Sequence, residues 1–360
     1  MPENRSFKVA ILGAGIGAEH LDGYLAHDDR FQVAVVCDLD RDRAQALADK
    51  ATGATTTPEI QAVLDDPTID IVDICLPPWM HHETALRALQ AGKHVVCEKP
   101  IAASVEQADQ LAAAAASADR LFFPVFQYRF GQGARQLRHL VSTGLAGIAY
   151  SASLETHWDR AGAYYEAAPW RGTWRGELGG ALVSHAIHAH DLLCFLLGPV
   201  ARVAAFQGTR VNDVENDDCA SIALEMENGA LATSSITLGA AENTSRLKFC
   251  FQHVTAESGT SPYHPGGEGW RFTARPPMGQ DSLDAALSAV PPGLDRFAGL
   301  FGELARALDG RDADVVSLAD GRRSLELASA IYASARRGVA IPLPLLPDDP
   351  IRRSWLPEDS

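Results

Sequence analysis

The sequence lacks any apolar run that approaches the length of a membrane-spanning helix, about 18 to 20 residues. Its 360 residues include only six cysteines, none of them in a CxxC pair. Basic side chains are also scarce, because 31 lysines and arginines against 46 acidic residues give a net charge of −15. These absences argue against a membrane protein, a disulfide-stapled secreted domain and a nucleic-acid-binding surface. We therefore expect no nucleic-acid and no membrane partner.

The start of the chain, Met1 to Phe7, is polar and leads directly into an apolar stretch, so no signal peptide is apparent. The cysteines lie mostly inside apolar runs, as reduced and buried thiols of a cytoplasmic protein do. Apolar residues make up 46% and charged residues 21% of the chain, which is typical of a globular protein with a sizeable core. The length suits two domains.

A glycine-rich turn, Gly13-Ala14-Gly15-Ile16-Gly17-Ala18, follows the first predicted strand at residues 8–12. Gly13 allows a tight turn, Gly15 lets a pyrophosphate approach the backbone, and Ala18 is small enough for close helix–strand packing. After a predicted helix, a second strand at 31–37 ends in Asp38, which lies 25 residues beyond Gly13 (38 − 13). An acid there accepts a hydrogen bond from a ribose hydroxyl. This order of elements predicts dinucleotide binding.

The pattern of alternating elements continues to about residue 129. Helices are predicted at 41–49, 83–91 and 105–118, and strands at 69–76, 94–97 and 121–126. Strands that alternate with helices at this spacing form a parallel, doubly wound sheet. We therefore predict an α/β protein with an N-terminal Rossmann domain at 1–129.

The tripeptide Glu98-Lys99-Pro100 ends the predicted strand at 94–97. Pro100 has no N–H for a sheet ladder, so it stops the strand and leaves Lys99 at the strand's carboxyl end. In an open α/β sheet, ligands bind at that edge. A lysine there polarises a carbonyl or passes a proton if burial and neighbouring charge lower its pKa. The alternative is a solvated Lys–Glu pair on a loop.

The second half of the chain predicts an α/β domain at 130–360 with a large, open, mostly antiparallel sheet. Strands are predicted at 148–157, 203–206, 219–226, 230–237 and 246–251, with Asn228-Gly229 as a hairpin turn. Helices are predicted at 136–141, 181–197, 297–308 and 321–337, the second of them opened by Gly179-Gly180. The stretch 258–293 is rich in Gly, Pro and Ser and reads as a long loop or insertion.

Two groups of side chains in this half are candidates for a site. The segment 164–176 is dense in aromatic residues and arginine, so it covers either a cleft or a peripheral patch of core. In a regular helix, positions 184, 188 and 191 share one face, as do 185 and 188. His188 suits a proton acceptor, because the ordinary pKa of histidine is near neutrality. We expect no metal, because this helix start has no cysteine and no His-x-x-x-His pair.

At these motifs the sequence resembles the Gfo/Idh/MocA family of NAD(P)-dependent sugar oxidoreductases. The matching stretches are Gly13–Ala18, Asp38, Pro77 to His81, Gly92 to Pro100, Gly179 to Asp191 and Asp320-Gly321-Arg322. The resemblance implies a Rossmann domain followed by an α/β domain whose open sheet often forms the oligomer interface. It therefore implies a homodimer or homotetramer. It also implies that Lys99 is catalytic and that His188 acts in proton transfer.

One position departs from the family's pattern. Many members carry an aspartate four residues before the helix histidine, whereas this chain has Ser184, followed by His185. We therefore expect Ser184 or His185 to take part of that role, with a core-facing His185 as the alternative. The resemblance further implies that the aromatic–arginine segment borders the substrate.

These considerations give two sets of predicted site residues. Those for NAD are Gly13, Gly15, Ile16, Ala18, Asp38, Arg43, Leu76, Pro77, His81, Glu98, Lys99 and Gln127. Those for substrate are Lys99, Arg129, Tyr164, Trp170, Arg171, Trp174, Ser184, His185, His188 and Asp191.

The predicted reaction is hydride transfer between NAD and a secondary alcohol of a sugar, sugar derivative or polyol. NAD is expected in preference to NADP, because Asp38 repels a 2′-phosphate, although Arg41 and Arg43 lie nearby. Two alternatives remain: a glycosidase that uses a bound NAD transiently, and a non-catalytic NAD-sensing regulator. The presence of both Lys99 and His188 argues against the regulator.

Overall fold

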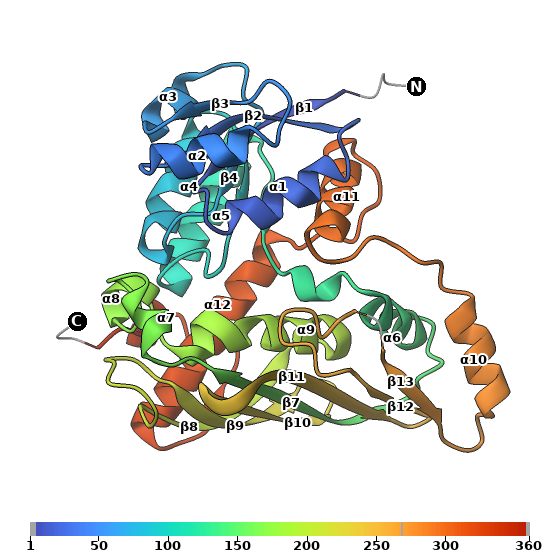
Figure 1. Ribbon diagram of the computed structural model, residues 1–360. Coiled ribbons are helices and arrows are strands. Elements are labelled where there is room, and N and C mark those ends of the chain that lie inside the picture. Colours follow the sequence, from blue (N-terminus) through green and yellow to red (C-terminus); the bar gives the residue numbers. More distant parts are fainter. Residues whose placement is uncertain (1–4, 268, 358–360) are drawn as a thin grey trace. The chain divides into compact units, whose positions relative to one another are not determined.

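The computed structural model describes residues 5–267 and 269–357, which form two compact units (Figure 1). The first unit comprises Met1–Val125 and Arg296–Arg322, and the second comprises Phe126–Asp295 and Arg323–Ser360. The predicted polar start at Met1 to Phe7 lies partly outside the described residues. The functional assignment of the predicted domains, 1–129 and 130–360, stays a prediction.

The first unit contains a six-stranded sheet in the order β3-β2-β1-β4-β5-β6. All its neighbouring strands are parallel, as the alternating pattern predicted. The strands are β1 (Phe7–Leu12), β2 (Phe31–Cys37), β3 (Thr55–Thr57), β4 (Ile71–Ile74), β5 (His94–Cys97) and β6 (Phe122–Pro124). The helices are α1 (Gly17–Leu25), α2 (Arg41–Ala48), α3 (Ile60–Asp65), α4 (His81–Gln90), α5 (Val105–Ala118) and α11 (Arg296–Leu308), with a short 3-10 turn η1 (Pro78–Met80) before α4. The Rossmann sheet is therefore confirmed.

Helix α11 comes late in the chain but packs on α1 in the first unit. The rings of Tyr24 and Phe301 stack with centroids 3.9 Å apart. A Cβ on Gly23 would lie 2.8 Å from Phe297 and Phe301, so glycine allows the two helices to approach closely. From the sequence, this helix was expected in the second domain, because no local pattern indicates that it packs on α1.

The second unit is built on an eight-stranded sheet in the order β13-β12-β11-β7-β10-β9-β8-β14. Only the β7–β10 pair is parallel in the described part of the chain. The strands are β7 (Ala149–Asp159), β8 (Val200–Gly208), β9 (Cys219–Met226), β10 (Leu231–Thr237), β11 (Gly239–Phe251), β12 (Val254–Glu257), β13 (Arg271–Ala274) and β14 (Ile341–Pro342). The helical segments are η2 (Gln127–Arg129), α6 (Gln132–Ser142), α7 (Gly162–Glu166), α8 (Trp174–Glu177), η3 (Leu182–Ala186), α9 (Ile187–Leu197), α10 (Gln280–Ser288), α12 (Leu318–Arg337) and η4 (Pro350–Arg352). The mostly antiparallel sheet is thus confirmed.

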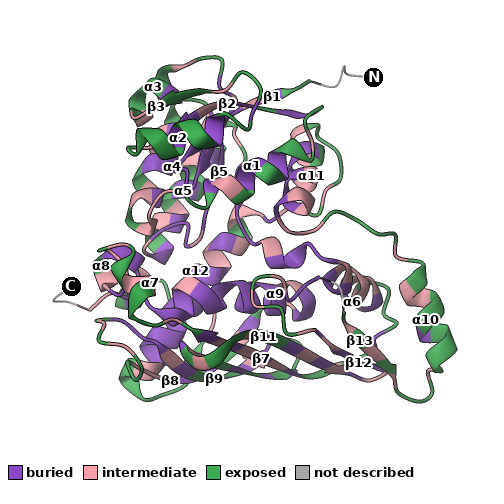
Figure 2. Cartoon of the chain, viewed as in Figure 1, coloured by how far each residue is buried: buried purple, intermediate pink, exposed green. Residues whose placement is uncertain are grey.

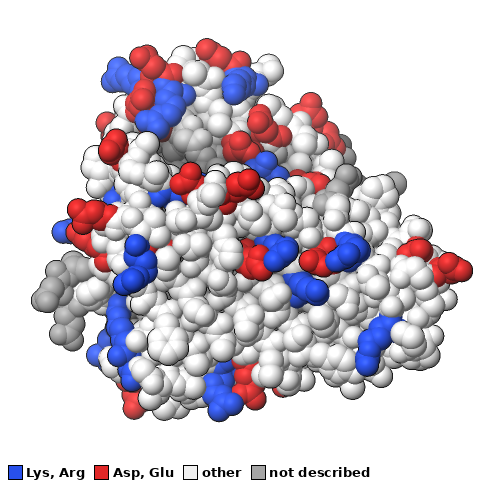
Figure 3. Space-filling model, turned by 60° about the horizontal axis from the view of Figure 1, so that its bottom comes forward, with Lys and Arg blue, Asp and Glu red and all other residues white. Residues whose placement is uncertain are grey.

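Residues along β9 and β10 alternate between buried and exposed, so one face of this sheet is core and the other is uncovered in this chain (Figure 2). Charged side chains on neighbouring strands of the sheet form cross-strand pairs, such as Arg202–Glu225 between β8 and β9 at 2.5 Å and Arg246–Glu155 between β11 and β7 at 2.8 Å. Figure 3 likewise shows several Lys or Arg side chains beside an Asp or Glu side chain. Assembly through this sheet stays a prediction.

The stretch 258–293 was predicted to be a long loop or an insertion, and as a loop the prediction is wrong in part. Strand β13 pairs with β12 over four residues, and α10 follows it. Both elements are short, and α10 buries only Leu283. The glycines and prolines that flank these two short elements therefore outweighed their strand and helix patterns in the sequence. Glu268, within the same stretch, lies outside the described residues.

Gly180 and Asp217 define the start of the histidine-bearing helix. The Asp217 carboxylate accepts hydrogen bonds from the backbone N–H groups of Gly180 (3.0 Å) and Leu182 (2.9 Å) and from the hydroxyl of Tyr332 (2.7 Å). A Cβ on Gly180 would lie 1.8 Å from the Asp217 carbonyl oxygen, so only glycine fits there. Asp217 thus satisfies orphan donors at the helix start.

The predicted regular helix at 181–197 is wrong in its first turn, because η3 is a π-helical turn and α9 begins only at Ile187. A π turn bonds i to i+5, so the periodicity of a regular α-helix does not apply to residues 182–186, and the shared face of positions 184 and 188 stays a prediction. The segment Trp174–Leu197 is long and apolar enough, by length and composition, to cross a membrane. However, 89% of its most apolar window is buried inside the structure, as in a core helix.

Candidate active site

The glycine turn lies at the carboxyl edge of the parallel sheet, between β1 and α1. Gly13 has a φ of +99°, and a Cβ there would lie 2.4 Å from the Cys75 carbonyl oxygen. Gly15 is exposed, and a Cβ there would meet nothing within 4 Å. The turn therefore has open space next to the N-terminus of α1, where a phosphate binds to backbone N–H groups.

The small residue needed for helix–strand packing is Gly17 rather than Ala18. A Cβ on Gly17 would lie 2.7 Å from the Ile11 side chain, whereas Ala18 is half-exposed. Ile16 is 42% exposed at the N-terminus of α1, next to the open space at Gly15. From the sequence, Ala18 was expected to allow the close helix–strand packing, although Gly17 stands one position before it.

Asp38 joins the end of β2 to the glycine turn. Its carboxylate accepts from the backbone N–H of Ala14 (2.8 Å) and from that of Asp40 (2.9 Å). The side chain of Asp38 is 14% exposed, and the Arg43 guanidinium Nε is 3.9 Å from its Oδ2. Each carboxylate oxygen has a second lone pair, so Asp38 keeps acceptor capacity for a ribose hydroxyl.

His81 contacts two turns at the same edge of the sheet. Its Nδ1 lies 2.7 Å from the Pro100 carbonyl oxygen, and its Nε2 lies 2.7 Å from the Leu76 carbonyl oxygen. Burial lowers the pKa of His81, which is 1% exposed. Leu76 and Pro77 are half-buried at the end of β4. His81 thus holds the Lys99–Pro100 turn against the turn after β4, rather than pointing into open space.

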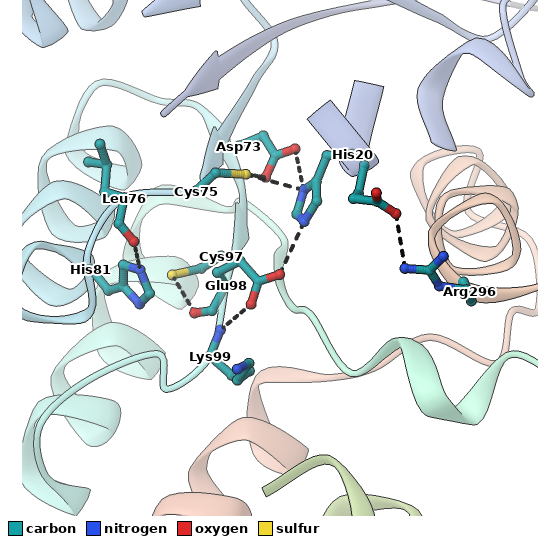
Figure 4. Close-up of polar contacts among 10 residues, drawn as sticks. His20, Asp73, Cys75, Leu76, His81, Cys97, Glu98, Lys99 and Arg296 are labelled. Carbon is teal, nitrogen blue, oxygen red and sulfur yellow. Dashed lines mark hydrogen bonds and ion pairs between the residues drawn. The ribbon is translucent and has the colours of Figure 1, made fainter. Parts of the chain in front are cut away.

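Glu98 and Lys99 follow β5 at this edge (Figure 4). The Lys99 backbone N–H donates to Glu98 Oε2 at 3.0 Å, and the Glu98 N–H donates to the Ile74 carbonyl at 3.0 Å. Glu98 is 7% exposed, whereas Lys99 is half-buried. The tripeptide is therefore anchored within the sheet edge, which argues against a solvated Lys–Glu pair.

The second unit brings Arg129 and Asp191 together as a buried ion pair. The guanidinium donates from Nε to Asp191 Oδ2 at 2.7 Å and from NH2 to Oδ1 at 2.5 Å. The two side chains are only 4% and 2% exposed. The pair links η2 to α9, so both residues have a structural role whatever they contact in a substrate complex. Nearby, Gln127 begins η2, and its buried Oε1 has no hydrogen-bond partner among the described residues.

His188 lies on α9 between aromatic rings. Its ring stacks on Tyr128, with centroids 4.8 Å apart, and meets Phe126 edge-on at 5.9 Å. His190, two residues on, has its Nε2 2.9 Å from the Ser234 hydroxyl. Burial lowers the pKa of His190 to about 4, so that imidazole is neutral at physiological pH. His190 therefore has a structural hydrogen bond, and His188 is the better candidate for a proton acceptor.

His185 lies in the π-helical turn and faces an aromatic cluster. Its ring meets Trp158 edge-on at 4.9 Å and lies 5.8 Å from the ring of Tyr164. The Arg171 guanidinium lies 4.1 Å from the centroid of Tyr164 and also bonds to its hydroxyl. Burial raises the pKa of Tyr164 to about 12. Trp170, Arg171, Tyr164 and His185 are thus contiguous, as predicted substrate residues should be.

Two further predicted substrate residues, Trp174 and Ser184, have contacts outside that cluster. Trp174 packs edge-on against Tyr332, at 5.5 Å, and its backbone N–H donates to Glu215 Oε2 at 3.1 Å. Ser184 is half-buried, and its hydroxyl lies 3.5 Å from the Gly179 carbonyl oxygen. Trp174 therefore packs against α12.

Sequence reasoning missed several members of the aromatic cluster. Trp158 lies at the end of β7 and Tyr263 lies far along the chain, yet their rings are 4.9 Å apart. Arg160 has its guanidinium 4.7 Å from the Trp158 centroid and donates to the Tyr263 hydroxyl at 2.8 Å. The run Trp158-Asp159-Arg160 precedes the aromatic–arginine segment directly, and that proximity was the available signal.

Family models match both halves of the chain. A model described as the oxidoreductase family with an NAD-binding Rossmann fold matches residues 7–126, and the GFO/IDH/MocA C-terminal domain matches residues 134–257. Among curated relatives, the D-glucoside 3-dehydrogenase of Escherichia coli K12 is 35% identical over 195 residues. That match covers 53% of this chain and 54% of the relative, so the chain spans about half its length. The Thermotoga maritima myo-inositol 2-dehydrogenase is 24% identical over 230 residues, 62% of this chain and 66% of that enzyme.

Solved structures match over nearly the whole chain. The WlbA dehydrogenase from Bordetella pertussis, in complex with NADH and UDP-GlcNAcA, has a TM-score of 0.83 and 27% identity, covering 95% of this chain and 100% of that one. A levoglucosan dehydrogenase in complex with NADH has a TM-score of 0.77 at 21% identity, covering 95% of this chain and 100% of that one, which supports the fold alone. The predicted fold is therefore confirmed, and the family model supports an NAD-binding Rossmann fold over residues 7–126.

Proposed function

This chain belongs to the Gfo/Idh/MocA oxidoreductase family, and we propose that it is an NAD-dependent dehydrogenase of a sugar or polyol. One observation supports this most: Lys99 lies at the same edge of the parallel sheet as the glycine turn and Asp38. A group that acts on substrate therefore follows one strand of a sheet whose neighbouring turns suit the cofactor.

The residues of the first unit fit NAD. The open space at Gly15 accommodates a pyrophosphate against the N-terminus of α1, and Asp38 has acceptor capacity for the ribose. When bound, NAD supplies the acceptor for the hydride that leaves the substrate carbon. The protein's part is to hold the cofactor and the substrate in place and to accept the hydroxyl proton.

We assign the proton transfer to His188 and the stabilisation of the developing oxyanion to Lys99. In the oxidative direction, the hydroxyl proton goes to the neutral imidazole while the carbon–oxygen bond becomes a carbonyl. The ammonium of Lys99 donates a hydrogen bond to that oxygen. In the reverse direction, the imidazolium of His188 gives its proton to the same oxygen, while Lys99 again donates a hydrogen bond to it. The aromatic cluster of Trp158, Tyr164 and His185 offers flat apolar surfaces for the faces of a sugar ring.

The substrate class proposed here is a hexose-based sugar or glycoside. The names of the relatives support it, since one is a D-glucoside 3-dehydrogenase and one WlbA complex contains UDP-GlcNAcA. Neither the transient-NAD glycosidase nor the regulator gains comparable support from these relatives. A cytoplasmic location and assembly through the second unit's sheet stay predictions.

The cofactor preference gives a first prediction. Asp38→Asn should weaken NAD binding by about tenfold, because it removes a charge-assisted hydrogen bond, while NADP binding does not weaken. The preference for NAD over NADP therefore falls by at least that factor. Asp40→Asn is the matched control, because Asp40 also pairs with Arg43, at 3.3 Å, but does not contact the glycine turn through its side chain. Equal or tighter binding of NADP by the unmodified protein would contradict the assignment.

The family's missing aspartate gives a second prediction. Ser184→Ala or His185→Ala should lower turnover by about tenfold, the scale of one lost hydrogen bond to substrate. His185 is favoured, because it borders Tyr164, whereas Ser184 faces its own helix start. Steady-state kinetics on both variants checks this. If both keep full turnover, neither residue belongs to the site.

A further inference from the structure

A buried cluster of ionisable side chains lies directly behind Glu98. His20, on α1, is 0% exposed. Its Nδ1 is 2.8 Å from Asp73 Oδ2, and its Nε2 is 3.2 Å from Glu98 Oε1 (Figure 4). The Cys75 sulfur is 3.4 Å from the same Nδ1. We call His20, Asp73, Cys75 and Glu98 the His20 cluster.

The remaining surroundings of His20 are aromatic rings and the hydroxyl of Tyr24, whose pKa is raised by burial and by the nearby Asp73 carboxylate. Its ring lies 4.6 Å from Phe297 and 5.6 Å from Phe301, both on α11. Tyr24, one turn further along α1, stacks on Phe301. Thus β4 and its following turn contribute Asp73 and Cys75, the residue after β5 contributes Glu98, and α11 contributes the aromatic rings of Phe297 and Phe301 next to the imidazole. His20 has no exposed surface, and the carboxylates of Asp73 and Glu98 are its hydrogen-bond partners.

The two short contacts determine how many protons the cluster holds. An ionised carboxylate only accepts hydrogen bonds, so each ring nitrogen of His20 needs its own proton to bond both Asp73 and Glu98. A neutral imidazole carries one such proton, and an imidazolium carries two. The doubly bonded geometry therefore favours the imidazolium.

The electrostatics of the cluster agree with that reading. Burial alone lowers the pKa of His20, but the Asp73 carboxylate raises it, and the net result lies well above 6.5. Burial also raises the pKa of Cys75 to about 12, so the thiol stays protonated and donates to Asp73 Oδ1 at 3.6 Å. Although His20, Asp73 and Cys75 include three metal-ligand atoms within 4.8 Å of one another, these hydrogen bonds already use them.

Glu98 connects this cluster to the predicted catalytic lysine. Its Oε1 faces His20, and its Oε2 accepts from the Lys99 backbone N–H at 3.0 Å. In Figure 4 Glu98 lies between His20 and Lys99. Any rotation of the Glu98 carboxylate therefore disturbs both contacts at once.

We propose that His20 is a positioning residue, held as an imidazolium between Asp73 and Glu98, and that through Glu98 it fixes the main chain at Lys99. His20 contacts neither substrate nor cofactor in this account. Its kinetic effect rests on the proposed dehydrogenase function, because Lys99 has to meet the substrate oxygen in a defined place.

The kinetic test uses the full chain with His20→Gln. We expect kcat to fall by about 10- to 100-fold, because a displacement of about 1 Å at a reacting group costs up to about a hundredfold. The Kd for NAD should stay within about twofold, since the glycine turn and Asp38 are unchanged. Glu98→Gln should show the same defect, and the double variant should be little worse than either single one, because the residues act as a unit.

The matched control is His27→Gln. His27 follows α1 and its Nε2 lies 2.7 Å from the Ala298 carbonyl oxygen, so it also joins α1 to α11. This variant should keep the full kcat, which separates positioning from a general loosening of the two helices. Full activity of His20→Gln, or an equal loss in His27→Gln, would overturn the proposal.

A second measurement does not depend on turnover. NMR of the protein labelled with ¹⁵N-histidine, with His20 assigned by its absence from His20→Gln, reports the protonation of both ring nitrogens. We expect an imidazolium signal that persists from about pH 6 to pH 8, above the ordinary pKa of histidine. A His20 signal that titrates near about 6.5 would overturn the proposal. If no sugar is oxidised by the unmodified protein, the proposed function fails, yet this measurement still decides the state of His20.

Discussion

Replacing Lys99 with alanine should lower kcat by roughly a hundredfold or more, the scale of losing one oxyanion-stabilising or proton-transfer group. NAD binding should stay nearly unchanged, because the pyrophosphate is expected at the glycine turn and the ribose at Asp38. The two quantities are measured by steady-state kinetics and by titration of NAD. Lys99→Arg should not restore activity, because the larger, planar guanidinium cannot place a donor where the compact ammonium of Lys99 lies.

A matched control for Lys99 is a lysine of the same unit with a structural role. Lys93 donates to the carbonyl oxygens of Asp66 (2.5 Å) and Ile69 (2.9 Å), and burial lowers its pKa. Lys93→Gln should lower the melting temperature but leave the kcat of the folded protein unchanged. A Lys99→Ala protein that keeps its full rate would mean that Lys99 is not catalytic.

Replacing His188 with alanine should also lower kcat by about a hundredfold or more, since it removes the proposed proton acceptor. The Lys99→Ala/His188→Ala double variant should lose much less than the product of the two single losses, because groups that act as a unit are not additive. His190→Gln is the control on the same helix. Its amide can keep the bond to Ser234, and the neutral His190 has no assigned role in proton transfer.

If the double variant lost as much kcat as the product of the two single losses, Lys99 and His188 would act in separate steps. That outcome would contradict their assignment to one reaction. An unchanged rate in His188→Ala would move the proton acceptor elsewhere, with His185 as the next candidate because it borders the aromatic cluster.

The parts of the fold that sequence reasoning predicted are those with a strong local signal. The glycine turn was predicted from a strand, a helix start and an acid at fixed spacing, and Gly13 indeed has a positive φ. The alanine-rich helix Val105–Ala118 was predicted with the same bounds that the structure has, and there Ser104 caps its start and Asp119 ends it in a left-handed conformation.

The parts that it missed depend on contacts between distant segments. No local pattern says that α11 packs on Gly23, or that β13 pairs with β12. The π-helical turn before His188 likewise has no sequence signature, so a regular helix was predicted there. His20 was missed for the same reason, because its partners Asp73 and Glu98 are 53 and 78 residues away. A histidine within the buried stripe of α1 was the one available hint.

The central claim is that this chain oxidises or reduces a secondary alcohol of a sugar or polyol with NAD. The most direct measurement follows nicotinamide absorbance while the purified chain is incubated with NAD and a panel of hexoses, glycosides and polyols. We expect NADH to form with at least one sugar, in an amount equal to that of the keto product. Lys99→Ala should abolish this formation of NADH. Cleavage of a glycoside without net NADH formation, or no change with any member of the panel while NAD is bound, would contradict the central claim.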